Sequence, residues 1–356
     1  MRKLLRPTGF VDSPFGHDGK VARLAGGLNW FASVELLTVD DGKRVAAELV
    51  PVEGIENRFD DDLAAQWQAL TVSRGPLQLG ERTVRLDQPQ VMGILNATPD
   101  SFSDGGQFAD SASAAEAGAT MAAAGAAIVD VGGESTRPGA SIVWEGDEIE
   151  RIVPIVRQLA NGGAAVSIDT RKAAVIEAAL GAGARMVNDV SALTFDQRSA
   201  ETVATAGVPV ILMHHQGDPQ SMQDNPRYGD VLVDVYEWLE DRIAAAETAG
   251  IVRDRILIDP GFGFGKTVAH NLELMNGLAL FHSLGCPIVL GASRKRTIGA
   301  LSNEANADQR LAGSLAFALK AVEQGAQILR VHDVAETVQA LKVWRGLRDQ
   351  ALTPRV

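Results

Sequence analysis

Residues 91–106 read VMGILNATPDSFSDGG: five apolar residues, Val91 to Leu95, are followed at once by asparagine, aspartate, serine and paired glycines. An apolar run of this length predicts a buried strand. A loop rich in glycine and aspartate at the carboxyl end of a strand is where α/β proteins bind their ligands. Because the same residues also form ordinary surface loops, a single stretch of this kind decides nothing about function. Its recurrence along the chain is what indicates the fold.

The alternation that begins at Val91 continues almost to the end of the chain. Alanine-rich or amphipathic segments separate eight apolar runs, which lie at 91–96, 127–133, 165–170, 186–191, 208–214, 256–261, 287–293 and 328–332. Several of the separating segments end in glycine, a common helix stop. Strands that alternate with helices predict a parallel sheet with right-handed crossovers. Eight units predict a (β/α)8 TIM barrel over residues 89–356, with an open doubly wound sheet as the alternative.

Residues 1–88 lack this alternation and predict a small α+β extension ahead of the barrel. Two strands, within 28–39 and 43–52, are separated by the turn-forming sequence Asp40-Asp41-Gly42. A short helix is expected over 61–69 and a second hairpin over 77–86. The extension carries no motif for a metal or a phosphate group, so we expect it to have a structural or interface role.

The composition limits the possible partners and the compartment. A formal charge of −12 argues against nucleic acid or an anionic membrane as the main partner. Cys286 is the only cysteine, which excludes an internal disulfide and fits a reducing compartment. The start of the chain has no apolar stretch of signal-peptide length, and no apolar run is long enough to span a membrane. We therefore expect a cytoplasmic protein with small-molecule substrates.

Polar residues interrupt the predicted strands near their carboxyl ends, where barrel enzymes place functional groups. Asp169, Asn188 and Asp259 stand at equivalent depths on separate strands. Burying such groups is costly unless they are paired or face a ligand. Together they would offer hydrogen-bond acceptors and an amide to a flat heterocycle that carries N–H donors.

Cationic residues follow other strands at the same end. Arg137, Lys295, Arg330 and His332 would supply charge for an anion, which would otherwise be repelled by the acidic protein as a whole. The predicted site is therefore bipolar, with acceptors on one side and cations on the other. Plainer interpretations remain open: Asp169 or Asp189 could cap the helix that follows, and Arg294 is more typical of a packing or surface cation.

Two further motifs suggest chemistry that their context does not support. His214 and His215 lack a third ligand at a zinc-binding spacing. Residues 261–267, GFGFGKT, resemble a phosphate loop, but the Walker pattern requires glycine where Pro260 stands. Neither motif is assigned a role at this stage.

Nine stretches, taken together, resemble dihydropteroate synthase, the folate-pathway enzyme that sulfonamides inhibit. They are GILNATPDSFSDGG, VDVGGESTRPGA, SIDTRKAAV, VNDVSAL, LMHHQGDPQSMQ, LIDPGFGFGK, LGASRK, RLAGSLAFALKA and RVHDVAET, and they occur in the family's order. The resemblance implies a (β/α)8 enzyme, a homodimer, that joins 4-aminobenzoate to 6-hydroxymethyl-7,8-dihydropterin diphosphate. The products would be 7,8-dihydropteroate and diphosphate, with Mg2+ as cofactor.

The resemblance also implies roles for individual residues. Those that grip or line the pterin would be Asp169, Asn188, Asp259, Lys295, Met213 and Gly291. Those that bind diphosphate would be Asn96, Arg137, Arg330 and His332, with Asn96 also ligating Mg2+. Those near the aminobenzoate would be Thr136, Pro138 and Phe264. The residues expected to carry catalysis are Asn96, Asp169, Asp259, Lys295, Arg330 and His332.

Two alternatives and several departures accompany this interpretation. A methyltetrahydrofolate-binding methyltransferase would share the pterin acceptors but has no use for a diphosphate site, and a non-catalytic pterin-binding paralogue would keep the loops without turnover. Arg171 stands where the family often has a small residue, and Arg296 stands where many members have a serine that helps to hold the aminobenzoate carboxylate. None of the departures removes a position expected to act in catalysis.

Overall fold

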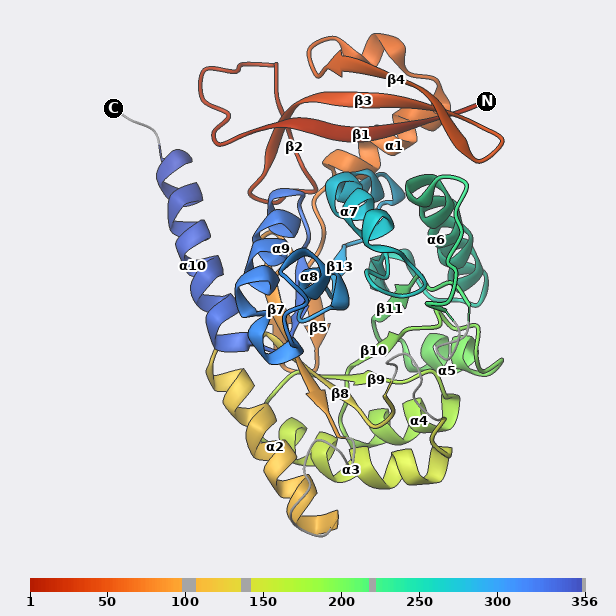
Figure 1. The fold of residues 1–356 in the computed structure, drawn as a ribbon, viewed down its shortest axis with the longest axis vertical. Coiled ribbons are helices and arrows are strands. Elements are labelled where there is room, and N and C mark those ends of the chain that lie inside the picture. Colours follow the sequence, from red (N-terminus) through yellow and green to blue (C-terminus); the bar gives the residue numbers. More distant parts are fainter. Residues whose placement is uncertain (98–106, 136–141, 218–221, 354–356) are drawn as a thin grey trace.

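The computed structural model describes residues 1–97, 107–135, 142–217 and 222–353 (Figure 1). Eight parallel strands form the central barrel, in the order β12-β11-β10-β9-β8-β7-β14-β13. Their bounds are β7 (Gln90–Asn96), β8 (Ile128–Gly132), β9 (Val166–Asp169), β10 (Met186–Asp189), β11 (Val210–Met213), β12 (Ile256–Asp259), β13 (Val289–Leu290) and β14 (Ile328–Val331). A parallel bridge between Ile258 and Ile288 joins β12 to the β13 side and closes the ring. The predicted barrel is confirmed, and the open doubly wound alternative is wrong.

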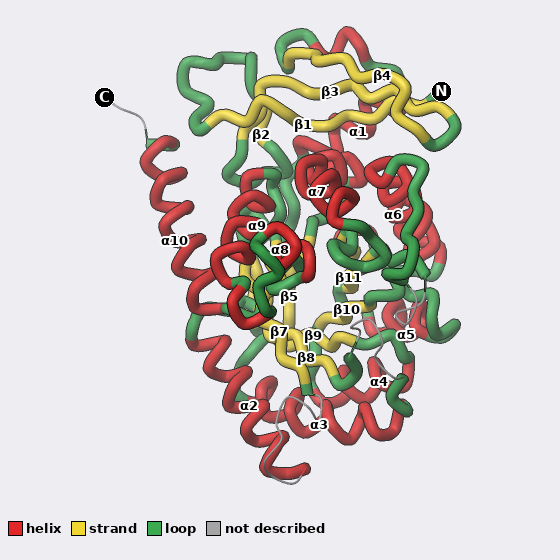
Figure 2. The backbone as a smooth tube through the Cα atoms, in the orientation of Figure 1, coloured by secondary structure: helices red, strands yellow, loops and turns green. Residues whose placement is uncertain are grey.

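Helices cover the outside of the barrel (Figure 2). They are α2 (Gln107–Ala123), α3 (Glu145–Asn161), α4 (Ala173–Ala182), α5 (Ser199–Ala206), α6 (Val231–Thr248), α7 (Val268–Gly277), α8 (Arg296–Leu301), α9 (Leu311–Glu323) and α10 (Val334–Ala351), with short 3-10 turns η3 (Arg253–Arg255) and η5 (Ala307–Gln309). The segment between β12 and β13 begins as α7 and changes at Leu278 into a 3-10 helix, η4 (Leu278–Leu284). All seven residues of η4 are buried, because the N-terminal extension lies over it. None of the described helices combines the length and apolar character needed to cross a bilayer.

The extension forms a separate layer beside the barrel, at the top of Figures 1 and 2. It contains β1 (Arg2–Val11), β2 (Ala22–Arg23), β3 (Trp30–Asp40), β4 (Lys43–Pro51), η1 (Ile55–Arg58) and α1 (Asp61–Thr71). The predicted hairpin of β3 and β4 and the predicted helix are confirmed, whereas β1 was not predicted. Strands β1 and β3 are buried on both faces: Leu5 and Val34 pack in the extension's own core, while Leu4 and Leu37 join the core of the barrel.

The second predicted hairpin, β5 (Leu77–Leu79) and β6 (Arg82–Val84), has a different place. Its apolar residues pack against the amino ends of the eight barrel strands, each of which contributes one residue from the strand or from the position directly before it. The cluster comprises Leu77, Leu79, Val84, Leu86, Met92, Ile128, Ala165, Met186, Ile211, Leu257, Val289 and Ile328. The hairpin therefore plugs that end of the barrel. Polar strand residues can meet a ligand only at the opposite, carboxyl end. The domain boundary at residue 88 stays a prediction.

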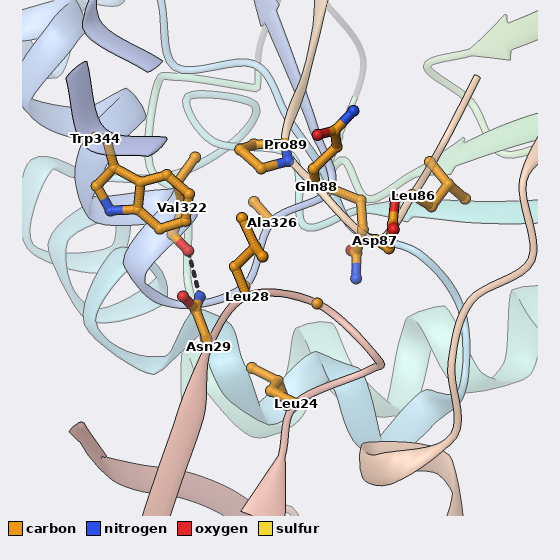
Figure 3. Close-up of a pocket in the computed structure, with 13 residues that line it drawn as sticks. Leu24, Leu28, Asn29, Leu86, Asp87, Gln88, Pro89, Val322, Ala326 and Trp344 are labelled. Carbon is orange, nitrogen blue, oxygen red and sulfur yellow. Dashed lines mark hydrogen bonds between the residues drawn. The ribbon is translucent and has the colours of Figure 1, made fainter. Parts of the chain in front are cut away.

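A small, half-open cavity of about 20 Å3 lies where the extension meets the barrel (Figure 3). Leu24, Leu28 and Leu86 line it together with Trp344 of α10. The Asn29 side chain crosses the junction and donates to the carbonyl oxygen of Val322 over 2.6 Å. None of the predicted site residues lines this cavity, so we assign it to the packing of the two parts.

Candidate active site

The register of the strands brings the predicted acceptors to one end of the barrel. Asn188 of β10 pairs with Asp169 of β9, and Met213 of β11 pairs with Asp259 of β12. The side chains of Asp169, Asn188 and Asp259 are almost completely buried. All three side chains lie above the apolar plug, in the polar layer at the carboxyl ends of the strands. The structure therefore brings together the three acceptors that the sequence scattered over about 90 positions.

One carboxylate that the sequence analysis did not select connects this layer. Asp130 of β8 is fully buried, and its Oδ2 accepts from Asn188 Nδ2 over 2.9 Å and from Arg330 Nε over 2.6 Å. Arg330 Nη2 also donates to Asp169 Oδ2 over 2.5 Å. Burial lowers the pKa of Arg330, but Asp130 and Asp169 outweigh it and raise that pKa overall, so the guanidinium stays charged. The signal available in the sequence was an aspartate inside the apolar run 127–133.

Two oxygens of this network lack a partner. Asp130 Oδ1 and Asp169 Oδ1 are buried and make no hydrogen bond to the described residues. Burial, with a smaller contribution from Asp130, raises the pKa of Asp169, while Arg330 opposes the shift. An unsatisfied buried acceptor costs about 1–3 kcal/mol. A ligand that donates N–H groups into this layer would remove that cost.

Asp259 and Arg330 open onto the same rim. A Cβ atom placed on Gly291 would lie 3.8 Å from Asp259 Oδ2 and 3.9 Å from Arg330 Cβ, so the missing side chain leaves shared space between them. The other oxygen of Asp259, Oδ1, accepts from the backbone N–H of Gly261 over 2.7 Å. Burial raises the pKa of Asp259. The hydrogen bond from the backbone of Gly261 and, to a smaller extent, the charge of Lys295 oppose this rise. Oδ2 is the atom of Asp259 that faces the space beside Gly291.

Lys295 and Phe264 form the next part of the rim. The Lys295 ammonium lies 4.0 Å from the centre of the Phe264 ring, a cation–π contact that orients both side chains. Arg294, just before Lys295, has a φ of 55° and pairs through two nitrogens with Asp333. A left-handed arginine is strained, and such strain is common beside functional sites. The expectation that Arg294 is a packing cation is confirmed.

His332 requires a correction. Its backbone N–H donates to Ser293 Oγ over 3.2 Å, so the serine hydroxyl is free to donate to His332 Nδ1 at 3.1 Å, leaving Nε2 with the proton. Burial, and then the charges of Arg294, Arg330 and Lys295, lower the pKa of His332 to about 4. The imidazole is therefore neutral near pH 7 in the free protein. It offers a hydrogen-bond donor, where a cation was expected.

Other predicted residues fall into three groups. Thr136, Arg137 and Pro138 lie outside the described residues. Asn96 ends β7 next to Gly132 and is half-buried. Asp189 accepts from Ser191 and from the backbone N–H of Leu193. It therefore holds a turn, and the predicted cap of the following helix is wrong for this residue, because α5 begins only at Ser199.

The departure at Arg171 is part of a buried network next to the site. Glu134 accepts from Arg171 Nε over 3.2 Å and from the backbone N–H of Val143 over 2.9 Å. Lys172 Nζ donates to the carbonyl oxygen of Val143 over 2.7 Å and pairs with Glu148. Within the described ranges, no group of three His, Cys, Asp or Glu residues is placed to hold a metal.

Comparisons with known proteins agree with this geometry. Residues 92–332 match the family described as pterin binding enzyme. Dihydropteroate synthase of Escherichia coli K12 is 47% identical over 259 residues, which cover 72% of this chain and 91% of the relative. A Xanthomonas albilineans dihydropteroate synthase solved with 4-aminobenzoic acid is 46% identical, with a TM-score of 0.74 over 79% of this chain and all of the other. A structure of the same enzyme with 7,8-dihydropteroate is 43% identical, with a TM-score of 0.70 over 78% of this chain and all of the other.

Proposed function

This chain belongs to the pterin-binding enzyme family, as a transferase among the dihydropteroate synthases, and from that membership we propose its reaction in detail. It couples 4-aminobenzoate to 6-hydroxymethyl-7,8-dihydropterin diphosphate and releases diphosphate and 7,8-dihydropteroate. The observation that carries this proposal is the buried layer of acceptors, in which Asp130 Oδ1 and Asp169 Oδ1 lack partners. The heterocycle of a pterin carries the N–H donors that such a layer lacks.

In this proposal the pterin lies in the acceptor layer. Its 2-amino and N3–H edge donates to a carboxylate, for which Asp259 Oδ2 is the best-placed oxygen. Asn188, held by Asp130, and Asp169, held by Arg330, meet the remaining edge. Because these side chains are already fixed by other protein groups, little reorganisation accompanies binding. Met213 and Gly291 line the pocket.

The diphosphate lies at the cationic side of the rim. Arg330 and Lys295 contribute charge, His332 contributes a neutral N–H donor, and Arg137 is proposed as a second arginine. Asn96 is proposed as a protein ligand of Mg2+. The fit rests on donor chemistry: Mg2+ takes few protein oxygens and completes its shell with water and substrate phosphate, and a side-chain amide oxygen at the end of β7 suits that pattern. When bound, the ion would neutralise charge on the departing diphosphate.

We propose a largely dissociative displacement at the pterin methylene. Cleavage of the carbon–oxygen bond transfers the electron pair to diphosphate, where Arg330 and His332 stabilise the new charge. The dihydropterin ring delocalises the cation left behind, and the neutral amine of 4-aminobenzoate then forms the new carbon–nitrogen bond and loses one proton to water. The arylamine needs no strong general base. Thr136, Pro138 and Phe264 are proposed as its neighbours.

The proposal also includes the oligomeric state of the enzyme and its cellular compartment. A homodimer in the cytoplasm follows from the family resemblance. The buried Cys286 fits a reducing compartment, because burial raises the pKa of its thiol to about 11 and leaves it unreactive. The methyltransferase alternative shares the acceptor layer but has no use for the anion end.

The test is the coupling of radiolabelled 4-aminobenzoate to the pterin diphosphate, with and without Mg2+. Labelled dihydropteroate that forms only with the metal supports the full proposal. Product formed equally well after chelation would remove Mg2+ from it. Binding of the pterin without any product would favour the non-catalytic alternative.

A further inference from the structure

Lys266 and His214 have no part in the proposed reaction, and the structure brings their side chains into contact. Lys266, the lysine of the GFGFGKT segment, points inward, and its Nζ lies 2.8 Å from Nδ1 of His214. Lys266 is 3% exposed and His214 is 4% exposed. Together they connect the loop after β11 to the loop after β12.

The surroundings of Lys266 Nζ consist of acceptors. Besides His214 Nδ1, it donates to the carbonyl oxygen of Gly261 over 3.0 Å and to that of Phe264 over 3.1 Å. Three acceptors match the three N–H bonds of an ammonium group. Burial lowers the pKa of Lys266 to about 7, and Asp259 is the main group that opposes this shift. Burial also lowers the pKa of His214 well below its ordinary value, so its ring is neutral and Nδ1 can accept.

The two carbonyl groups belong to residues that control the substrate site. Gly261 accepts from Lys266 through its oxygen and donates through its N–H to Asp259 Oδ1. Phe264 accepts from Lys266 through its oxygen and carries the ring that Lys295 covers. One ammonium group therefore fixes the backbone on which both the Asp259 carboxylate and the Phe264–Lys295 pair depend.

The shape of the loop depends on close approaches that only glycine permits. Gly261 has a φ of 69°, and a Cβ atom there would lie 1.7 Å from the carbonyl oxygen of His214. Gly265 has a φ of 64°, and its Cβ would lie 2.4 Å from the carbonyl oxygen of Gln216. Asn271, Gln223 and Tyr228 hold the backbone of Gly263 and Gly265. The bonds from Lys266 restrain the carbonyl groups of Gly261 and Phe264, the two residues that contact Asp259 and Lys295.

We propose that Lys266, with His214 as its third acceptor, is the positioning residue of the substrate site: it holds the 261–265 loop so that Asp259 and Phe264 face the ligand. This rests on the proposed function, because the readout is binding of the pterin and of 4-aminobenzoate. Lys266 itself touches neither substrate. Its effect passes through Gly261 to the acceptor layer and through Phe264 to the rim.

The test compares Lys266→Met with a matched control in the full-length protein. Arg74→Met is that control, because Arg74 is also a buried cation that donates only to backbone carbonyls, those of Ala69, Val72 and His282, at the junction with the extension. For both variants and the native protein, calorimetry gives the dissociation constant of the pterin diphosphate. Steady-state kinetics give the KM for 4-aminobenzoate separately from kcat.

We expect Lys266→Met to weaken pterin binding and to raise the KM for 4-aminobenzoate, each by about tenfold. Arg74→Met should lower thermal stability while leaving both constants within about twofold of native. Equal constants for Lys266→Met and the native protein would overturn the inference. If Lys266→Met does not fold, His214→Leu takes its place, since it removes one of the three acceptors; we then expect a rise of about threefold, and unchanged constants would again overturn it.

The two proposals fail in different ways. A native protein that binds the pterin but forms no dihydropteroate contradicts the proposed reaction and leaves the binding measurements on Lys266 intact. A native protein that turns over normally, with Lys266→Met as active and as tight-binding as native, contradicts only the positioning role.

Discussion

Asp130→Asn tests whether the buried carboxylate of β8 organises the substrate site. The substitution keeps the size of the side chain and removes its charge. In the native protein one oxygen, Oδ2, receives both Arg330 Nε at 2.6 Å and Asn188 Nδ2 at 2.9 Å. An asparagine can place its one acceptor oxygen there, but that oxygen carries no formal charge, so the bond from Arg330 is no longer charge-assisted. Arg330 and Asn188 then share a weaker anchor.

The magnitude follows from the kind of bond that is lost. A hydrogen bond to a charged group contributes about 1.5–3 kcal/mol. Arg330 keeps its bond to Asp169, so the main loss is that of one charge-assisted bond and of the orientation of Asn188. If the whole of this loss appears in ligand binding, the dissociation constant of the pterin diphosphate rises by about tenfold to hundredfold.

The assay is isothermal calorimetry with the pterin diphosphate, and Asp189→Asn is the matched control. Asp189 is equally buried, on β10, but its carboxylate holds the turn at Ser191 and Leu193. The control should therefore lose stability and retain pterin affinity. A pterin affinity unchanged in Asp130→Asn, or lowered equally in both variants, would refute the view that Asp130 acts on the site.

Three further predictions concern single residues or one pair. Arg330→Met should destabilise the protein by about 3–5 kcal/mol in urea unfolding, because it leaves the buried carboxylates of Asp130 and Asp169 without their cation. A loss of stability below about 1 kcal/mol would contradict this. Diphosphate binding should raise the depressed pKa of His332, so binding should take up a proton and tighten as the pH falls through the bound-state pKa; calorimetry in buffers of different ionisation enthalpy compares this uptake in native protein and in His332→Gln, and equal uptake by both would contradict a His332 pKa raised by the anion. Asp230→Asn keeps the N-cap of α6 but breaks the salt bridge to Arg44 of the extension. Because Arg44 is partly exposed, the free energy of unfolding should fall by only about 1 kcal/mol. In a double-mutant cycle with Arg44→Met the two effects should be coupled, and simple additivity would rule out a contribution from the bridge.

The amino-acid sequence by itself determined the barrel and most of the acceptors. The barrel was predictable because each strand is a short apolar run and each helix an alanine-rich or amphipathic segment, and such patterns depend on neighbours in the chain. Asp169, Asn188 and Asp259 were predictable for the same reason, as polar residues inside or at the ends of apolar runs. The strand β1 was not, because its basic residues and Pro7 obscure a strand pattern that is completed only by pairing with β3.

Tertiary structure decided what each polar group does. Asp130 and Asp189 are both aspartates in apolar runs, yet the first joins Arg330 to Asn188 and the second holds a local turn. His332 and Lys266 carry ordinary side chains in the sequence, and only burial makes the one neutral and depresses the pKa of the other. Hydrogen-bond partners and desolvation are set by residues that lie far away in the chain, and so they exist only once the barrel has closed.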